Sequence, residues 1–319
     1  MGAFLKLKQI LEEKHSFALI CHVEPDGDAI GSILALGEAL EKRAKDVRFV
    51  SKDPAPGILH YLKGGEKISH ELPEDQEVTI LLDNGDFRRT GFMDELTEMK
   101  KKGMTIINID HHPKNDLWKF VSVNYVDPAA SSTSEILYRI FTGCDFEITP
   151  SIATALLTGI FYDTGGFQHS NTTDEVLNIA SDLMKKGAKL RKISENIANS
   201  RPISLFKLWG IALSRLSFRE EWGLSVSVIT QEDIRKAGAT EEDVSGLIGL
   251  LNSTPESKAA LLLYETKDAK IKGSLRTDRD DVDVSKLAAL FGGGGHKKAS
   301  GFSVNGRIEV NGSEWKVVN

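Results

Sequence analysis

The sequence predicts an α/β protein with two domains: an N-terminal parallel sheet with helices on both faces, followed by a smaller α+β domain. Three observations support this fold class. The chain has 319 residues, more than one ordinary compact domain needs. In its first half, short apolar runs alternate with helical patterns, as in βαβ units. Beyond about residue 200, apolar runs joined by a short polar turn are typical of paired strands.

Composition narrows the class of protein. Apolar residues make up 40% and charged residues 27%, an ordinary globular balance. The net charge of -6 provides no overall positive field for long nucleic acid. Cys21 and Cys144 fit neither a disulfide framework nor a zinc pattern, which favours a reducing compartment. No apolar stretch reaches the roughly 20 residues that span a bilayer. We therefore expect a cytoplasmic protein without a membrane segment.

The first domain is expected over residues 1–185. An amphipathic helix over 1–14 opens it. Strands are predicted at 17–21, 47–50, 78–82 and 104–109, with helices at 30–40 and 91–101. Ser132 and Glu135 form a capping-box pattern ahead of another helix, and a further helix follows Pro150 and ends near Asp163.

The second domain is expected over residues 204–319, after a connection at 186–203 that contains charged residues and closes with Arg201 and Pro202. Strands are predicted at 224–229, 259–264 and 269–275, the last two as a hairpin. A helix at 282–290 leads into four consecutive glycines. This order predicts a mixed α and β domain.

Side chains that can bind metal follow three of the predicted strands. His22, Asp26 and Asp28 come after the first strand, Asp83 after the strand that ends at Leu82, and Asp110, His111 and His112 at the end of another. Ligands bind beyond the carboxyl ends of parallel strands, so these residues can converge on one crevice. Carboxylates with one or two imidazoles favour hard or borderline divalent ions, manganese first.

Each of these motifs also has a simpler explanation. Asp26 and Asp28 occur in a turn that could merely cap the next helix. Asp83 begins a sequence that is common in turns, and His111 and His112 could be surface histidines. Joint occurrence decides between the two interpretations. Unrelated turns have no reason to place metal-compatible groups at three strand ends.

Five segments resemble the motifs of the DHH phosphoesterase family, in the family's order. Four are in the first domain, at residues 22–32, 81–83, 110–112 and 159–167. The fifth, FGGGGHKKASGF at 291–302, resembles the glycine-rich signature of the DHH-associated domain. The resemblance therefore implies a DHH domain followed by a DHH-associated domain.

The resemblance implies two divalent metal ions, with magnesium or cobalt as alternatives to manganese. His22, Asp26 and Asp83 would hold one ion, and the second would be held by Asp28, Asp83, His111 and Asp163. Asp83 would bridge the pair, and a hydroxide shared by both ions would attack phosphorus. As further catalytic residues, His112 would contact the scissile phosphate and Asp110 would orient a neighbouring histidine.

The glycine-rich segment has a physical reading of its own. Successive glycines allow backbone amides to approach phosphate oxygens closely. A flexible connection between helix and strand is the simpler alternative. The resemblance favours a substrate-binding loop, whose contacts to a phosphate or nucleoside would come from Arg276, Gly293, Gly294, Gly295, His296 and Ser300.

Within the family, the two-domain layout resembles the bifunctional oligoribonucleases and phosphoadenosine phosphate phosphatases, or nanoRNases. This implies hydrolysis of short oligonucleotides to mononucleotides and of adenosine 3',5'-bisphosphate to AMP, in a cleft between the domains. A phosphodiesterase of cyclic or linear dinucleotides, such as c-di-AMP or pApA, is the alternative, and a non-catalytic nucleotide sensor the second. No long nucleic acid or membrane is expected as a partner, and a homodimer is conceivable.

Overall fold

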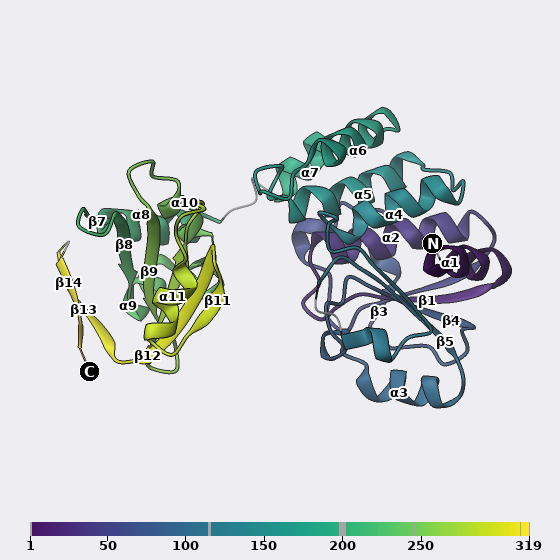
Figure 1. Cartoon of the computed structure of the whole chain (residues 1–319), viewed down its shortest axis with the longest axis horizontal. Coiled ribbons are helices and arrows are strands. Elements are labelled where there is room, and N and C mark those ends of the chain that lie inside the picture. The colour runs from purple at the N-terminus through teal and green to yellow at the C-terminus, as the bar shows by residue number, and fades with distance from the viewer. Residues whose placement is uncertain (1, 114–115, 198–201, 245, 313, 319) are drawn as a thin grey trace. The chain divides into compact units, whose positions relative to one another are not determined.

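The computed structural model describes residues 2–113, 116–197, 202–244, 246–312 and 314–318 (Figure 1). The chain divides into two compact units, Met1–Ser200 and Arg201–Asn319. Among the described residues, no helix is both long and apolar enough to cross a membrane.

The first unit contains a six-stranded sheet in the order β3-β2-β1-β4-β5-β6, and every neighbouring pair is parallel. The order reverses between β1 and β4, because the chain adds strands on one side and then on the other. This switch point is where doubly wound sheets bind ligands. The strands are β1 Ser16–Ile20, β2 Asp46–Val50, β3 Ile68–Ser69, β4 Val78–Leu82, β5 Thr105–Asp110 and β6 Val123–Val126.

Helices cover both faces of this sheet, as predicted. Figure 1 shows α1, α2, α4 and α5 on one side and α3 on the other. The larger apolar core lies on the first side, and Leu96 and Met99 of α3 pack into a separate core on the second. The helices are α1 Gly2–Glu13, α2 Gly27–Glu41, α3 Met93–Lys101, α4 Thr133–Gly143, α5 Pro150–Asp163, α6 Asp174–Lys185 and α7 Leu190–Ile197.

Two glycines allow the helices beside the switch point to pack closely. A Cβ on Gly31 of α2 would lie 2.5 Å from the carbonyl oxygen of Ala155 in α5. A Cβ on Gly159 of α5 would lie 2.2 Å from Asp28 Oδ1 and 2.1 Å from Ser134 Oγ. These distances are too short for any side chain, so both glycines set how near α5 comes to the carboxylate of Asp28.

The second unit is built around a mixed sheet in the order β11-β12-β10-β9-β8-β7, in which only β8 and β9 are parallel. A separate antiparallel ribbon, β13–β14, follows. The strands of the second unit are β7 Ser217–Arg219, β8 Leu224–Ile229, β9 Ala259–Glu265, β10 Lys270–Arg276, β11 Gly294–His296, β12 Ala299–Asn305, β13 Arg307–Asn311 and β14 Glu314–Val318. Its helices are α8 Ile203–Ser214, α9 Gln231–Ala237, α10 Leu247–Asn252 and α11 Val284–Leu290.

This architecture confirms the predicted fold class, including the β9–β10 hairpin. Two of the predicted segments contain regular secondary structure. The predicted connection at 186–203 contains helix α7, whose Ile193 is buried in the core of the first unit, while residues 198–201 lie outside the described residues. The second half of the glycine-rich segment forms strand β11 rather than an open loop, because it pairs with β12.

Candidate metal centre

The metal-compatible side chains of the three strand ends lie together at the switch point. His22 Nε2 lies 3.8 Å from Asp83 Oδ2, and His111 Nε2 lies 3.2 Å from Asp163 Oδ2. Three groups have ligand atoms within 4.8 Å of one another: His22 with Asp26 and Asp83, Asp28 with His111 and Asp163, and Asp83 with His111 and His112. All six predicted metal ligands belong to these groups.

Asp83 lies at the centre of the cluster. Its two carboxylate oxygens face different partners: Oδ2 faces His22, and Oδ1 lies 3.5 Å from His111 Nε2. The residue has a positive φ of 62°, a conformation that aspartate tolerates better than most residues. The next residue, Asn84, joins the ends of β1 and β4. Its Nδ2 donates to the carbonyl oxygens of Ile20 and Leu82, at 3.2 and 3.0 Å. A carboxylate held in this way can be shared by two adjacent ions.

The amino end of α4 orients two of the carboxylates. The backbone amides of Thr133 and Ser134 donate to Asp28, at 2.6 and 2.9 Å, and the Thr133 hydroxyl donates to Asp83 at 2.9 Å. The expected capping box is only half formed. Ser132 Oγ accepts from the Glu135 amide at 3.1 Å, but the Glu135 carboxylate accepts from the amide of the residue before Ser132. Sequence reasoning missed Thr133 and Ser134 as orienting residues.

Histidine orientation is fixed by hydrogen bonds on the far side of each ring. His22 Nδ1 donates to the carbonyl oxygen of Val23 at 2.7 Å, which leaves Nε2 to face the carboxylates. Asp110 is fully buried and accepts from His112 Nδ1 at 2.7 Å and from the Gly85 amide at 2.8 Å. The hydrogen bond to Asp110 raises the pKa of His112. This geometry is what an orienting role for Asp110 requires.

The electrostatics of the cluster fit bound cations. Burial raises the pKa of Asp83 well above its ordinary value, and the neighbouring charges of Asp28 and Asp163 raise it further. Burial followed by the charges of Asp28 and Asp26 likewise raises the pKa of Asp163. Crowded carboxylates of this kind repel one another unless positive charge lies between them. Oxygen and imidazole donors without thiolate suit hard or borderline divalent ions.

A basic side chain that sequence reasoning missed lies beside the cluster. Arg89 Nη1 lies 3.1 Å from the position that a Cβ on Gly85 would take, and His112 Cδ2 lies 3.6 Å from the same position. Arg89 is half-buried, and its guanidinium forms no hydrogen bond or ion pair within the described ranges. Its neighbour Arg88 is exposed. No motif marked Arg89, because only the turn after β4 brings it to His112.

The predicted substrate-binding residues gather at one end of the second unit's sheet. Arg276 of β10 pairs with Ala299 of β12, and Gly295 pairs with Ser300. Arg276 and His296 are exposed. Their role in binding substrate stays a prediction.

The glycines of this segment differ in what they allow. A Cβ on Gly293 would lie 2.2 Å from the Gly301 carbonyl oxygen, and one on Gly295 would lie 2.7 Å from that of Ala299. A Cβ on Gly294, in contrast, would have no heavy atom of a described residue within 4 Å apart from its two chain neighbours. Gly293 and Gly295 are therefore required by backbone packing, whereas Gly294 leaves space beside its backbone for a ligand.

Comparisons with known proteins agree with this fold and site. The profile of the DHH family, N-terminal domain, matches residues 16–160, and that of the DHHA1 domain matches residues 223–311. The bifunctional oligoribonuclease and PAP phosphatase NrnA of Thermus thermophilus is 36% identical to this chain, covering 89% of the chain and 83% of that protein. The Bacillus subtilis protein of the same name is 29% identical, covering 89% of this chain and 87% of that one.

One solved structure resembles this chain over almost its whole length. The crystal structure of an exopolyphosphatase-related protein from Bacteroides fragilis superposes with a TM-score of 0.82 at 27% identity, covering 96% of this chain and 92% of that one. A doubly wound sheet with a histidine and aspartate cluster at its switch point, followed by a DHHA1 domain, defines the class. The chain belongs to the DHH family of phosphoesterases.

Proposed function

We propose that this phosphoesterase hydrolyses short oligonucleotides to mononucleotides and adenosine 3',5'-bisphosphate to AMP. The observation that carries the proposal is the cluster at the switch point, in which Asp83 turns one carboxylate oxygen to His22 and the other to His111. The near full-length similarity to proteins named oligoribonuclease and PAP phosphatase supports this choice of substrates.

Two divalent ions, manganese ahead of magnesium or cobalt, would be held by the predicted ligand sets. When bound, such ions supply Lewis acidity that activates water and offsets charge on the phosphoryl group. The chain's own contribution is to fix the ligands. Thr133 and Ser134 hold Asp28 and Asp83, and Val23 holds His22, so little rearrangement is needed when a metal binds.

His112 and Arg89 are placed to handle the phosphate. The bond from His112 Nδ1 to Asp110 fixes the ring, so that Nε2 is the nitrogen left to donate to a phosphoryl oxygen. The Arg89 guanidinium also lies beside Gly85 and has no carboxylate partner among the described residues. Arginine can bind two phosphate oxygens at once, so this pair would orient the scissile group for in-line attack.

Substrate length is proposed to be limited by charge and by the second unit. The chain has a net charge of -6, so only a few phosphates can be neutralised locally. Arg276, His296 and the open backbone at Gly294 would bind the remaining phosphate or nucleoside. Long strands would gain little attraction from a chain whose net charge is negative.

The test is a product time course with metal-depleted protein resupplied with manganese, magnesium or cobalt. The substrates are a two-nucleotide RNA, linear and cyclic diadenylate, adenosine 3',5'-bisphosphate and pyrophosphate. Fast cleavage of the linear dinucleotide and the bisphosphate, fastest with manganese, is the expected result. Preference for the cyclic compound would indicate a second-messenger phosphodiesterase instead. Tight binding without turnover of any substrate would indicate a nucleotide sensor.

A further inference from the structure

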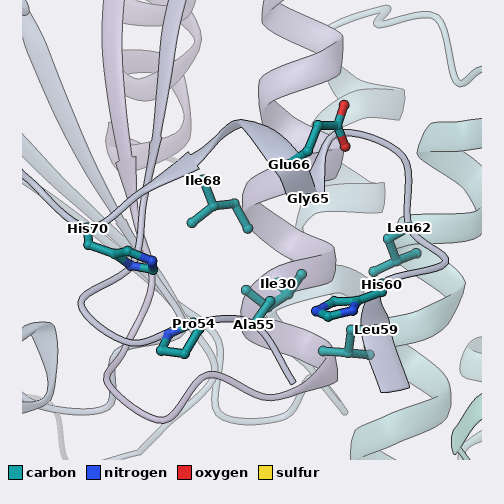
Figure 2. Close-up of a pocket in the computed structure, with 10 residues that line it drawn as sticks. All are labelled: Ile30, Pro54, Ala55, Leu59, His60, Leu62, Gly65, Glu66, Ile68 and His70. Carbon is teal, nitrogen blue, oxygen red and sulfur yellow. The ribbon is translucent and has the colours of Figure 1, made fainter. Parts of the chain in front are cut away.

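A cavity of about 380 Å³ lies in the first unit beyond the end of β2 (Figure 2). Most of its wall comes from residues 54–70, which run from the end of β2 into β3, and α2 contributes Ile30. The side chains that line it are mainly apolar, with two histidines and one glutamate: Ile30, Pro54, Ala55, Leu59, His60, Leu62, Gly65, Glu66, Ile68 and His70.

The segment that lines the cavity and the turn that carries the first metal ligands are neighbours at the carboxyl end of the sheet. β2 is the direct neighbour of β1, about 4.8 Å away as in any sheet, and both strands end at this edge. Ile30 follows Asp28 by two residues in the same helix. The carboxylate of Asp53 also accepts from the Glu24 amide at 2.8 Å, which ties the cavity segment to the turn after β1. These links place the segment that lines the cavity beside the turn that carries His22 and Asp26.

The lining suits a flat heterocycle and not a second phosphate. Among the described residues that line the cavity, none is lysine or arginine, so an anion would be poorly compensated. Figure 2 shows His60 and His70 on opposite sides, with Ile30, Ala55 and Ile68 between them. Apolar walls bind the faces of a nucleobase, and imidazoles can stack on it or bond to its edge.

His70 is oriented before any ligand binds. Its Nδ1 lies 2.8 Å from the Ser51 carbonyl oxygen, and a carbonyl only accepts, so this nitrogen is the one that carries hydrogen. In the neutral ring, Nε2 is then left as an acceptor for an amino group of a base. The ring of His60, in contrast, makes no hydrogen bond to any residue that the structure describes.

The wall itself is anchored in the folded core. Leu59 and Leu62 are only 2% and 5% exposed and belong to the main apolar core of the unit. Between them, the Tyr61 hydroxyl lies 2.8 Å from Thr158 Oγ1 of α5, the helix that ends at Asp163. A cavity with such walls is largely preformed, which lowers the entropic cost of binding.

We propose that this cavity is a nucleobase subsite, which binds the base of a nucleotide whose phosphate lies at the metal centre. This proposal rests on the proposed function, because it assigns part of that substrate to a second place in the same unit. It makes the base, and not only the phosphate, a determinant of KM.

The first experiment crosses protein variants with substrate variants. Wild type, His70→Ala and the control His15→Ala, an exposed histidine beside the amino end of β1, are assayed on linear diadenylate and on its two singly abasic analogues. We expect His70→Ala to raise KM for diadenylate up to about tenfold, as for loss of one hydrogen bond to the base, and His15→Ala to leave KM unchanged. The His70→Ala effect should vanish with one abasic analogue. An equal effect on all three substrates, or no effect, would overturn the subsite.

The second experiment does not depend on turnover. The full-length protein is photolabelled with 8-azidoadenosine 5'-monophosphate in the presence of manganese, and labelled peptides are identified by mass spectrometry. We expect labelling within 51–70 that excess AMP suppresses; labelling confined to other segments would overturn the subsite. If wild type cleaves no dinucleotide, the proposed function fails, while labelling within 51–70 still identifies a nucleobase site.

Discussion

The metal centre of the first unit and the glycine-rich end of the second unit's sheet are constructed in opposite ways. Asp28 and Asp83 are at most 2% exposed, and backbone or hydroxyl donors fix each of them. Arg276 and His296 are exposed, and in this segment Gly294 adds only open backbone. One region holds its geometry without a ligand, and the other offers groups that a ligand would order.

This difference suggests how the two regions divide the work. A buried, pre-oriented set of donors suits chemistry, because the transition state gains from groups that need no rearrangement. An exposed segment suits capture of substrate, where each contact contributes modestly and similarly in ground and transition states. Substitutions in the first region should therefore affect turnover, and those in the second should mainly affect KM.

The largest effect is expected at the centre of the cluster. Asp83→Ala removes the carboxylate that faces both His22 and His111, and should abolish metal binding and lower kcat by at least about a thousandfold. Titration calorimetry with manganese and a dinucleotide assay measure the two effects. Asp94→Ala, at an exposed position in α3, is the matched control and should behave as wild type. Full activity of Asp83→Ala would contradict the assignment of the metal centre.

The next effect concerns the adjacent arginines after β4. Arg89→Ala should lower kcat/KM by about ten- to a hundredfold, because the half-buried guanidinium beside His112 would no longer bind the phosphate. Arg88→Ala removes an equal charge from an exposed position and should change kcat/KM less than about twofold. Arg89→Lys should recover only part of the loss, since a single ammonium cannot replace a bidentate contact. Equal losses of kcat/KM in Arg88→Ala and Arg89→Ala would contradict a specific phosphate contact of Arg89 and indicate general charge attraction only.

The sequence alone was sufficient to predict the fold class and the convergence of the strand ends. Buried parallel strands are near-continuous apolar runs, so the polar residue that follows, such as Asp83, marks the ligand-binding edge directly. Thr133 and Arg89 could not be found in this way. Their roles depend on where α4 and the turn after β4 lie relative to β1, and such tertiary proximity leaves no local pattern. The strand order around the switch point is likewise a property of packing.

A smaller effect should separate the residues of the glycine-rich segment. Gly293→Ala places a Cβ 2.2 Å from the Gly301 carbonyl oxygen and should destabilise the second unit by about 1–3 kcal/mol. Gly294→Ala meets no described atom within 4 Å and should leave thermal stability unchanged while raising KM. His296→Ala should also retain metal binding and raise KM. A loss of metal binding in His296→Ala would contradict the assignment of chemistry to one region and substrate binding to the other.

The effect least related to the metal cluster is on stability in acid. It arises from Asp233, a carboxylate whose pKa shifts in the opposite direction to that of Asp83. Burial would raise the pKa of Asp233, but hydrogen bonds from Arg215 and Thr230 outweigh burial and lower it. The Arg215 Nη2 bond to Asp233 Oδ1 is 2.9 Å long, and the two side chains are only 12% and 7% exposed. Breaking such a pair by Asp233→Asn should cost about 3–5 kcal/mol at neutral pH.

The sign of the pH dependence follows from that lowered pKa. A folded-state pKa below the unfolded value of about 3.9 means that the unfolded chain binds the proton more readily. The contribution of Asp233 is therefore complete above that pH and is lost as pH falls through the folded-state value. Unfolding followed by fluorescence, to which Trp209 in this unit's core contributes, should show a gap between wild type and Asp233→Asn that narrows below about pH 4. The exposed Asp268→Asn variant should match the stability of wild type at every pH. If the stability difference between wild type and Asp233→Asn stays constant down to a pH of about 2, the ion pair is not its source.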